Sequence, residues 1–363
     1  MVCYAVAPIP TNKSRPGGEL GNFMPPRIVV MGGGTGSYTV LQGLKHYTDH
    51  LTAVVSVADD GGSSGRLRDE FGHLPPGDLR KCLVALSPSD EIGQVLRHLL
   101  DFRFSRGNGL DGHNFGNLML TALTEITGNS VDAIQQASTL LNIQGVVLPV
   151  TLEDTRLVAE LQDSTVIRGE THIDRRKGSS SALIQRIYLD PEPTVDDRVR
   201  QAIIDAEIIV IGPGDLYTSV LPNLLVRGVP EAIRESQAVV VYACNLMTKS
   251  GETNGFKASD FVREVHSYLG PGNTIDYVLA NDRSFPQEVI DRYAVEHSLS
   301  VEIDIDRCYG YADKVICAPL AAAGELVRHD PNLLAQAILS IAQAQNLSQA
   351  SPPTPSRPRR NLA

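Results

Sequence analysis

Short apolar segments alternate with helical patterns along most of the chain, and this alternation limits the folds open to it more than any other feature. The segments place Val, Ile, Ala and Leu on consecutive positions, as in strands that are covered on both faces. Six of them lie at 27–31, 51–57, 145–150, 207–211, 238–243 and 275–280. Because helical patterns follow these strand candidates, we predict an α/β fold with a doubly wound, mostly parallel, Rossmann-like sheet.

The helical patterns repeat apolar residues at a spacing of three or four. They predict helices at about 37–47, 77–86, 91–100, 115–126, 131–141, 196–205, 229–235, 258–268, 286–295 and 331–345. Residues 152–190 differ, because their apolar and polar residues alternate in short runs between Gly169, Gly178 and other turn residues. We predict a small β-rich insertion there.

Both ends of the chain lack hydrophobic periodicity. Residues 1–26 and 349–363 are rich in Pro and Gly or in Pro, Ser and Arg, and we expect disordered tails, the second of them basic. The 363 residues are 42% hydrophobic, which is enough for a sizeable core. We therefore expect a single α/β domain over residues 27–348.

Charge and cysteine usage exclude several classes of protein. The formal net charge of -10 argues against a nucleic-acid binder, which needs a basic face. The five cysteines are scattered without a CxxC pair, so neither a metal cage nor a disulfide framework is expected. The start of the chain is a poor signal peptide, and no segment reaches the roughly 18 apolar residues of a membrane span. We expect a cytoplasmic homo-oligomer without a membrane span.

Glycines follow the first strand candidate directly, at Gly32-Gly33-Gly34-Thr35-Gly36-Ser37. Such a loop lets backbone N–H groups at the start of the next helix approach an anion. It does not match the dinucleotide fingerprint, because Ser37 or Thr39 stands where the last glycine should be. The loop predicts a phosphate site and argues against a nicotinamide-dependent oxidoreductase.

The second strand candidate ends at Asp59-Asp60-Gly61-Gly62-Ser63-Ser64-Gly65-Arg66. Acidic residues at this position commonly accept hydrogen bonds from ribose hydroxyls, and two adjacent carboxylates could instead hold Mg²⁺ through water. Arg66, and Arg80 one turn inside the following helix, could pair with phosphate. A solvated loop is the alternative.

Three further segments combine glycine, asparagine and hydroxyl residues. The loop Gly212-Pro213-Gly214-Asp215 repeats the pattern of a strand, glycines and a helix, and Asp215 is expected to cap that helix. The segment His113-Asn114-Phe115-Gly116-Asn117 opens a helix and could form a polar pocket floor. Asn245 follows a strand end, where side chains of this architecture face the ligand.

Local spacing assembles no catalytic set of known type. There is no Ser-His-Asp or Cys-His arrangement, no HExxH motif and no Walker motif. The candidate catalytic residues are Asp59, Asp60, Arg66 and Arg80, and the candidate metal ligands are Asp59 and Asp60. The candidate ligand-binding residues are Gly33, Gly34, Thr35, Gly36, Asp59, Asp60, Gly62, Ser63, Ser64, Asn114, Asn117, Gly212, Gly214 and Asn245.

Taken together, these motifs resemble those of the YvcK family, whose members are called gluconeogenesis factors. The resemblance rests on residues 32–36, 59–67, 75–80, 113–118, 212–214, 216–219, 221–224 and 245–248, and it covers about residues 27–345. The family is related to the CofD phospholactate transferases, so the resemblance implies a CofD-like fold. It also implies that residues 32–36 and 59–66 form a cleft for a nucleoside diphosphate. One departure is Asp215, where the family more often has Ser.

The resemblance leaves two functions open. The first is a regulatory protein that binds a UDP-sugar, UDP-N-acetylglucosamine above all, without turnover and in support of cell shape and wall synthesis during gluconeogenic growth. The second is a transferase of the 2-phospho-L-lactate transferase type that uses Mg²⁺ and a nucleoside-diphosphate-activated donor. Under either function, replacing Thr35 by Val and Gly36 by Ala is expected to abolish nucleotide binding and leave folding nearly intact.

Overall fold

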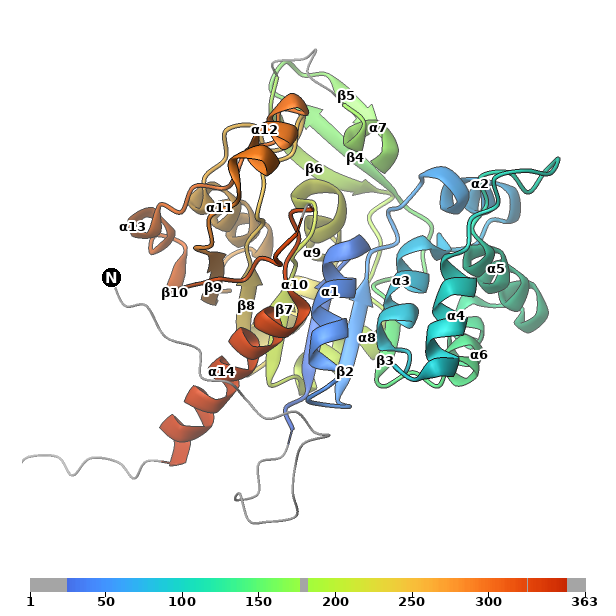
Figure 1. Ribbon diagram of the computed structural model, residues 1–363, viewed down its shortest axis with the longest axis horizontal. Helices are drawn as coiled ribbons and strands as arrows, with labels where there is room; N and C mark the ends of the chain where they lie inside the picture. Colours follow the sequence, from blue (N-terminus) through green and yellow to red (C-terminus); the bar gives the residue numbers. More distant parts are fainter. Residues whose placement is uncertain (1–24, 177–181, 325, 351–363) are drawn as a thin grey trace, which may run out of the picture.

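A seven-stranded parallel sheet forms the centre of the computed structural model, which describes residues 25–176, 182–324 and 326–350 (Figure 1). The strands lie side by side in the order β10 (Ala312–Ala318), β9 (Ile275–Asn281), β8 (Val239–Ala243), β7 (Ile208–Ile211), β1 (Ile28–Gly32), β2 (Leu51–Val55) and β3 (Val146–Pro149). Every neighbouring pair is parallel. The predicted doubly wound α/β fold is confirmed.

The order of strands reverses between β1 and β7. From β1 the chain adds β2 and β3 on one side, then returns to place β7, β8, β9 and β10 on the other. The two central strands pair directly, with Ile28 beside Ile208. Loops that leave β1 and β7 diverge to opposite faces, so a cleft is expected at the carboxyl ends of these strands.

Alternate side chains of the strands enter two separate hydrophobic cores. In β1, Ile28 and Val30 face one core, and Val29 and Met31 face the other. Helices α1 (Gly34–Leu44), α3 (Pro76–Leu86), α4 (Glu91–Asp101), α5 (Phe115–Thr127), α6 (Ser130–Leu140) and α14 (Pro331–Ala350) contribute to the first core. The second takes in α8 (Asp197–Asp205), α9 (Leu221–Leu224), α10 (Val229–Glu235), α11 (Ala258–Leu269) and α13 (Ile305–Cys308). The sheet is therefore covered on both faces, as its continuous apolar strands require.

A three-stranded antiparallel sheet packs against the second core. Its strands are β5 (Val166–Arg168), β4 (Arg156–Leu161) and β6 (Ile184–Asp190), and the short helix α7 (Glu170–Asp174) lies between β5 and β6. This sheet confirms the β-rich insertion predicted for residues 152–190. Gly178 and the serines at 179–181 lie outside the described residues.

Some elements differ from the sequence-based expectation. Helix α2 (Gly62–Phe71) and strand β10 were not predicted, and α1 begins at Gly34, inside the glycine run. Helix α14 continues to Ala350, so the tail expected from residue 349 begins too early. The remaining tail residues, 1–24 and 351–363, lie outside the described residues, and their disorder stays a prediction.

None of the helices in the described ranges is long and apolar enough to cross a membrane. Cys82, Cys244, Cys308 and Cys317 form no disulfide, and the first three of them are buried. The absence of disulfides among these four agrees with their scattered spacing.

Candidate functional site

A cavity of about 650 Å³ opens at the carboxyl ends of β1, β7 and β8, beside the reversal of strand order. Its walls come from the loops after these strands and after β2, the start of α3, helix α7 of the insertion, the end of α12 (Gln287–Val295) and residues 327–329. The predicted residues that line it are Gly33, Gly34, Thr35, Gly36, Asp59, Gly214 and Asn245. The cavity lies where ligands bind in open α/β sheets.

The glycine-rich loop ends in the first turn of α1, which faces the cavity. Gly33 is the N-cap residue, and Gly34 has a positive φ of 63°, which glycine adopts without strain. Within the described residues, no side chain caps this helix, and its first turn contains no acidic residue. The N–H groups at its start, at the positive end of the helix dipole, are therefore available to an anionic ligand.

Gly33 and Gly36 are also packing residues. A Cβ at Gly33 would stand 2.5 Å from Oδ2 of Asp78, and a Cβ at Gly36 would overlap the carbonyl oxygen of Pro213. Glycine at position 36 thus lets α1 approach the loop after β7. This close approach argues against the expectation that replacing Gly36 by Ala leaves folding nearly intact, because the added methyl group would displace backbone.

Carboxyl groups gather at the end of the cavity nearest β2. Asp59 accepts a hydrogen bond from the N–H of Gly61 at 2.9 Å, and Lys81 forms an ion pair with Asp78 at 3.0 Å. Burial and then the charge of Asp78 raise the pKa of Asp59. Burial, followed by the charges of Asp59 and other carboxylates, raises the pKa of Glu170 to about 8. Glu170 is thus mostly protonated at neutral pH and can donate a hydrogen bond.

Asp60 turns away from the cavity, although it is adjacent to Asp59. Its Oδ2 accepts a hydrogen bond from the N–H of Glu170 at 3.1 Å, and its Oδ1 accepts one from Thr171 at 2.8 Å. Asp60 therefore fixes the start of α7 to the loop after β2. Of the predicted metal pair, Asp59 alone lines the cavity, and the described residues contain no group of three or more potential metal ligands.

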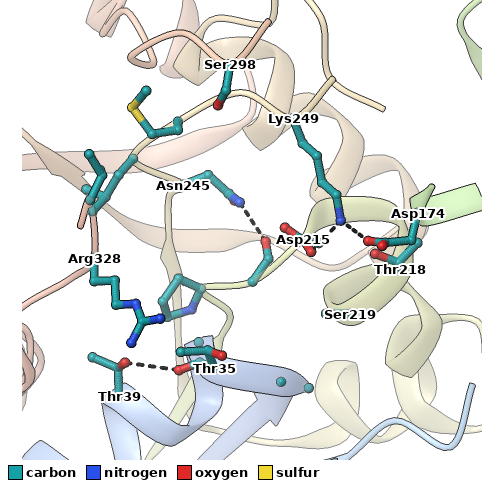
Figure 2. A pocket seen from close by; sticks show the side chains of 18 of the residues that line it. Thr35, Thr39, Asp174, Asp215, Thr218, Ser219, Asn245, Lys249, Ser298 and Arg328 are labelled. Carbon is teal, nitrogen blue, oxygen red and sulfur yellow. Dashed lines mark hydrogen bonds and ion pairs between the residues drawn. The ribbon is translucent and has the colours of Figure 1, made fainter. Parts of the chain in front are cut away.

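Lys249 joins three carboxylates, and Figure 2 shows its contacts with two of them, Asp174 and Asp215. Its Nζ contacts Asp174 of α7, Asp215 at 2.6 Å and the fully buried Glu252 at 3.1 Å. Burial acts to lower the pKa of Lys249, but these carboxylates raise it above its usual value. Burial also raises the pKa of Glu252 to about 7, against the effect of Lys249. Because several carboxylates share its charge, Lys249 contributes little net positive charge to the cavity.

The predicted capping role of Asp215 is wrong. Asp215 precedes the π-helical turn η2 (Leu216–Val220), and no side-chain cap is formed there within the part of the chain that is described. Its carboxylate pairs with Lys249 instead. The negative charge at this position is therefore neutralised by the loop after β8.

Asn245 occupies the predicted place at the end of β8. Its Nδ2 donates a hydrogen bond to the carbonyl oxygen of Gly214 at 2.6 Å, as Figure 2 shows, and its Oδ1 lies 3.2 Å from the hydroxyl of Tyr242. The amide thus ties the loop after β7 to the loop after β8. These contacts make Asn245 a residue that positions the cavity wall.

No sequence motif pointed to Arg328 and His329, which form the wall opposite the glycine-rich loop. In Figure 2 the guanidinium of Arg328 points toward Thr35 and Thr39 of α1, and within the described residues it makes no ion pair. His329 is buried, and burial lowers its pKa to about 4, so it is neutral at physiological pH. Arg328 therefore supplies the positive charge of this wall.

Four predicted ligand-binding residues form a polar network that does not line the cavity. The Oγ of Ser63 lies 3.2 Å from Nδ1 of His113, and Asn114 caps α5 by accepting a hydrogen bond from the N–H of Asn117. The Nδ2 of Asn117 donates to the Oγ of Ser64 at 3.3 Å. These residues join the starts of α2 and α5, a structural role.

The other predicted residues also lie outside the cavity lining. Arg80 is buried and pairs with Asp101 and Asn117, and Arg66 donates to the carbonyl oxygen of Asp111. Gly62 begins α2 with a φ of 49°, and Gly212 precedes the cavity-lining Pro213 with a φ of 73°. A direct contact of either arginine with a cavity ligand would need a movement of its side chain.

Comparison with known proteins places these features in a family. Residues 28–321 match the profile of the family described as 2-phospho-L-lactate transferase CofD. The gluconeogenesis factor of Halalkalibacterium halodurans is 42% identical over 86% of this chain and 95% of its own length. That of Bacillus subtilis is 39% identical over 87% of this chain and 98% of its own length.

A solved structure has the same fold over nearly all of the described chain. The crystal structure of a UPF0052 family protein from Bacillus halodurans is 40% identical and has a TM-score of 0.80. The match covers 86% of this chain and 99% of that one. The likeness therefore extends over most of the chain.

Proposed function

The chain belongs to the 2-phospho-L-lactate transferase CofD family, and we propose that it binds a nucleoside-diphosphate sugar, UDP-N-acetylglucosamine above all, in the cavity beside the strand reversal. The observation that carries the proposal is the uncapped start of α1, which faces Arg328 across the cavity. Backbone N–H groups on one side and a guanidinium on the other are a recurring arrangement for binding phosphate oxygens.

Charge separates the cavity into two ends. Lys81 and Lys249 are paired with carboxylates, so the positive potential is concentrated between α1 and Arg328, where a pyrophosphate would lie. The end formed by Asp59 and Glu170 would repel phosphate but can accept or donate hydrogen bonds to sugar hydroxyls. A ligand with a central pyrophosphate and polyhydroxylated ends matches this distribution.

The relatives called gluconeogenesis factors support a regulatory role. We propose that the protein is cytoplasmic and couples the supply of a nucleotide sugar to cell shape and wall synthesis during gluconeogenic growth. In this role the ligand is bound and released unchanged. The described cysteines form no disulfide, which agrees with a reducing compartment.

Calorimetry with the purified chain tests the proposal. UDP-N-acetylglucosamine is expected to bind, and the Arg328→Ala variant to bind at least about tenfold more weakly, since a hydrogen bond to a charged group contributes roughly 1.5–3 kcal/mol. Arg307→Ala is the matched control, because Arg307 is exposed on α13 and does not line the cavity. Absence of binding at millimolar ligand, or equal losses in the two variants, would rule the proposal out.

A transferase that uses Mg²⁺ is the second candidate, and the carboxyl cluster favours it. Burial and repulsion from Asp78 raise the pKa of Asp59, so a cation beside this carboxylate would be stabilising. Asp59 could hold Mg²⁺ together with water and the ligand's phosphates, whereas Asp60 is committed to α7. Magnesium-dependent consumption of the nucleotide donor would favour this function, and recovery of intact ligand would count against it.

We also propose that the protein is a homo-oligomer. The support comes from exposed apolar side chains on α4, at Ile92, Val95 and Leu99. Apolar side chains gathered on one exposed helix face are typical of protein–protein contacts.

A further inference from the structure

Helix α4 carries a row of exposed apolar side chains on its outer face. Ile92 is 72% exposed, Val95 63%, Leu99 45%, and Phe102 at the helix C-cap 51%. Phe104 lies against Phe102 in an edge-to-face contact, with ring centroids 5.1 Å apart. The opposite side of the helix packs inward through Leu100 and contacts α3 and α5. The row, which we call the α4 stripe (Ile92, Val95, Leu99 and Phe102), is thus separate from the protein core.

The spacing of the α4 stripe is that of a helix-pairing seam. Its members follow one another at intervals of three, four and three residues, which keeps them on one face of a helix. Within the described ranges this face is left uncovered by the chain itself. None of the four residues lines the cavity beside the strand reversal. The stripe is therefore a candidate contact surface and not part of the ligand site.

We propose that the α4 stripe binds the α4 stripe of a second copy of this chain. The two helices are antiparallel, and the twofold axis crosses them level with position 97 along each helix. The sequence positions are symmetric about residue 97, so Ile92 of each copy meets Phe102 of the other, and Val95 meets Leu99. A twofold contact requires such self-complementarity, because the same patch must serve both copies.

Charges at the ends of the stripe agree with the antiparallel arrangement. Glu91 opens α4 and Arg103 follows it, and both are exposed. In the antiparallel register Glu91 of one copy lies level with Arg103 of the other, whereas parallel helices would place like charges together. The charge pattern therefore favours a second copy over a partner of unrelated sequence.

The area buried between two α4 stripes is small, and this area limits the affinity expected for the dimer. Four side chains together with Phe104 make an interface at the low end of specific interfaces, below about 1,200 Å² in total. We expect a reversible dimer with a dissociation constant in the micromolar range. Its formation does not depend on the nucleotide proposed above, so the two proposals can fail separately.

Sedimentation of the full chain over roughly 1–200 µM tests the contact. The unsubstituted chain is expected to dimerise, and Val95→Asp to weaken dimerisation at least tenfold by placing a charge in the seam. Val295→Asp is the matched control, because Val295 is an exposed valine, 80% accessible, on α12. Because both positions are exposed, both variants should fold. A monomer throughout this range, or equal dimerisation of the two variants, would overturn the proposal.

Disulfide cross-linking tests the direction of the helices. When chains carrying Val95→Cys are mixed with chains carrying Leu99→Cys, the antiparallel register should give disulfides mainly between the two kinds of chain. A parallel register would give disulfides within each kind, and that result would overturn the proposed arrangement. In a parallel measurement, Glu91→Arg should weaken the dimer and the added Arg103→Glu should restore it. The unsubstituted chain controls for its own cysteines.

Discussion

At the scale of single residues, Glu170 is expected to make stability depend on pH. Burial and neighbouring carboxylates raise its pKa from 4.5 to about 8 in the folded protein, so the folded state binds a proton more tightly than the unfolded state. The stability that protonated Glu170 contributes is fully present below the pKa of this group in the unfolded chain. It is lost as the pH rises through the pKa of Glu170 in the folded protein. Between pH 5 and pH 9 the free energy of unfolding should fall by on the order of 1 kcal/mol because of Glu170, allowing for solvent screening.

Denaturant unfolding of Glu170→Gln at pH 5 and pH 9 measures this contribution. The variant should lose less unfolding free energy between the two pH values than the unsubstituted protein, because glutamine does not titrate. Glu288→Gln, at an exposed position on α12, serves as the control and should follow the unsubstituted protein. If the unfolding free energies of all three proteins show the same pH dependence, the pKa of Glu170 is not raised in the folded protein.

Adjacent residues also mark the limit of what sequence could predict here. The pair Asp59-Asp60 was expected to act together, yet one side chain lines the cavity and the other holds α7. The two roles could not be told apart from the sequence, because Asp60 accepts hydrogen bonds from N–H groups of the insertion, which lie 110 and 111 residues further along the chain. Arg328 was missed for a similar reason, since it reaches the cavity from a loop almost 300 residues after the glycine-rich loop.

At the scale of elements, the packing of α1 against the loop after β7 depends on Gly36. A methyl group there would overlap the carbonyl oxygen of Pro213, so Gly36→Ala is expected to lower the free energy of unfolding by about 3 kcal/mol. Thr35→Ser is the control, because Thr35 is exposed at the cavity and its change adds no atoms. Equal unfolding midpoints for the two variants would show that α1 can shift without cost.

The elements that sequence predicted are those with strong periodicity. Helix α10 was predicted with the observed bounds, and the strands beside the reversal were predicted to within one residue, since their apolar runs are uninterrupted. Helix α2 was missed because glycine and serine, as in Gly62-Ser63-Ser64-Gly65, have low helix propensity. Tertiary contacts override this local preference and make the segment helical. Strand β10 was missed because Asp313 and Lys314 interrupt it, as is common at a sheet edge.

At the scale of the whole molecule, strand alternation predicted the fold class, and the glycine and asparagine loops marked strands whose ends form the cavity, but neither predicted the order of the strands in the sheet. The position of β7 beside β1 follows from the return of the chain across the sheet, a long-range choice that no local pattern contains. The small sheet was predicted as an insertion, yet its place on the cavity wall was not. That place depends on contacts that α7 makes with the loops after β2 and β8.

Lys249, on the loop after β8, joins the insertion to the loop after β7, and its removal is expected to loosen the contacts between these three segments. In Lys249→Met the carboxylates of Asp174, Asp215 and the buried Glu252 lose their common cation. Breaking a buried pair in this way costs about 3 kcal/mol of unfolding free energy. The loss should be greater at pH 8 than at pH 6, because the pKa of Glu252 is about 7 and the carboxyl group is more often charged at the higher pH.

Chemical denaturation at both pH values, with hydrogen exchange at residues 170–174, measures this loosening. The exchange of α7 should quicken more than that of β1, because α7 depends on Lys249 and β1 is held by its neighbours in the sheet. Lys257→Met is the matched control, since its pair with Glu302 is exposed and contributes at most about 1 kcal/mol. If the two variants lose the same stability, or if α7 keeps its protection, the insertion is held to the sheet by apolar packing and not by this lysine.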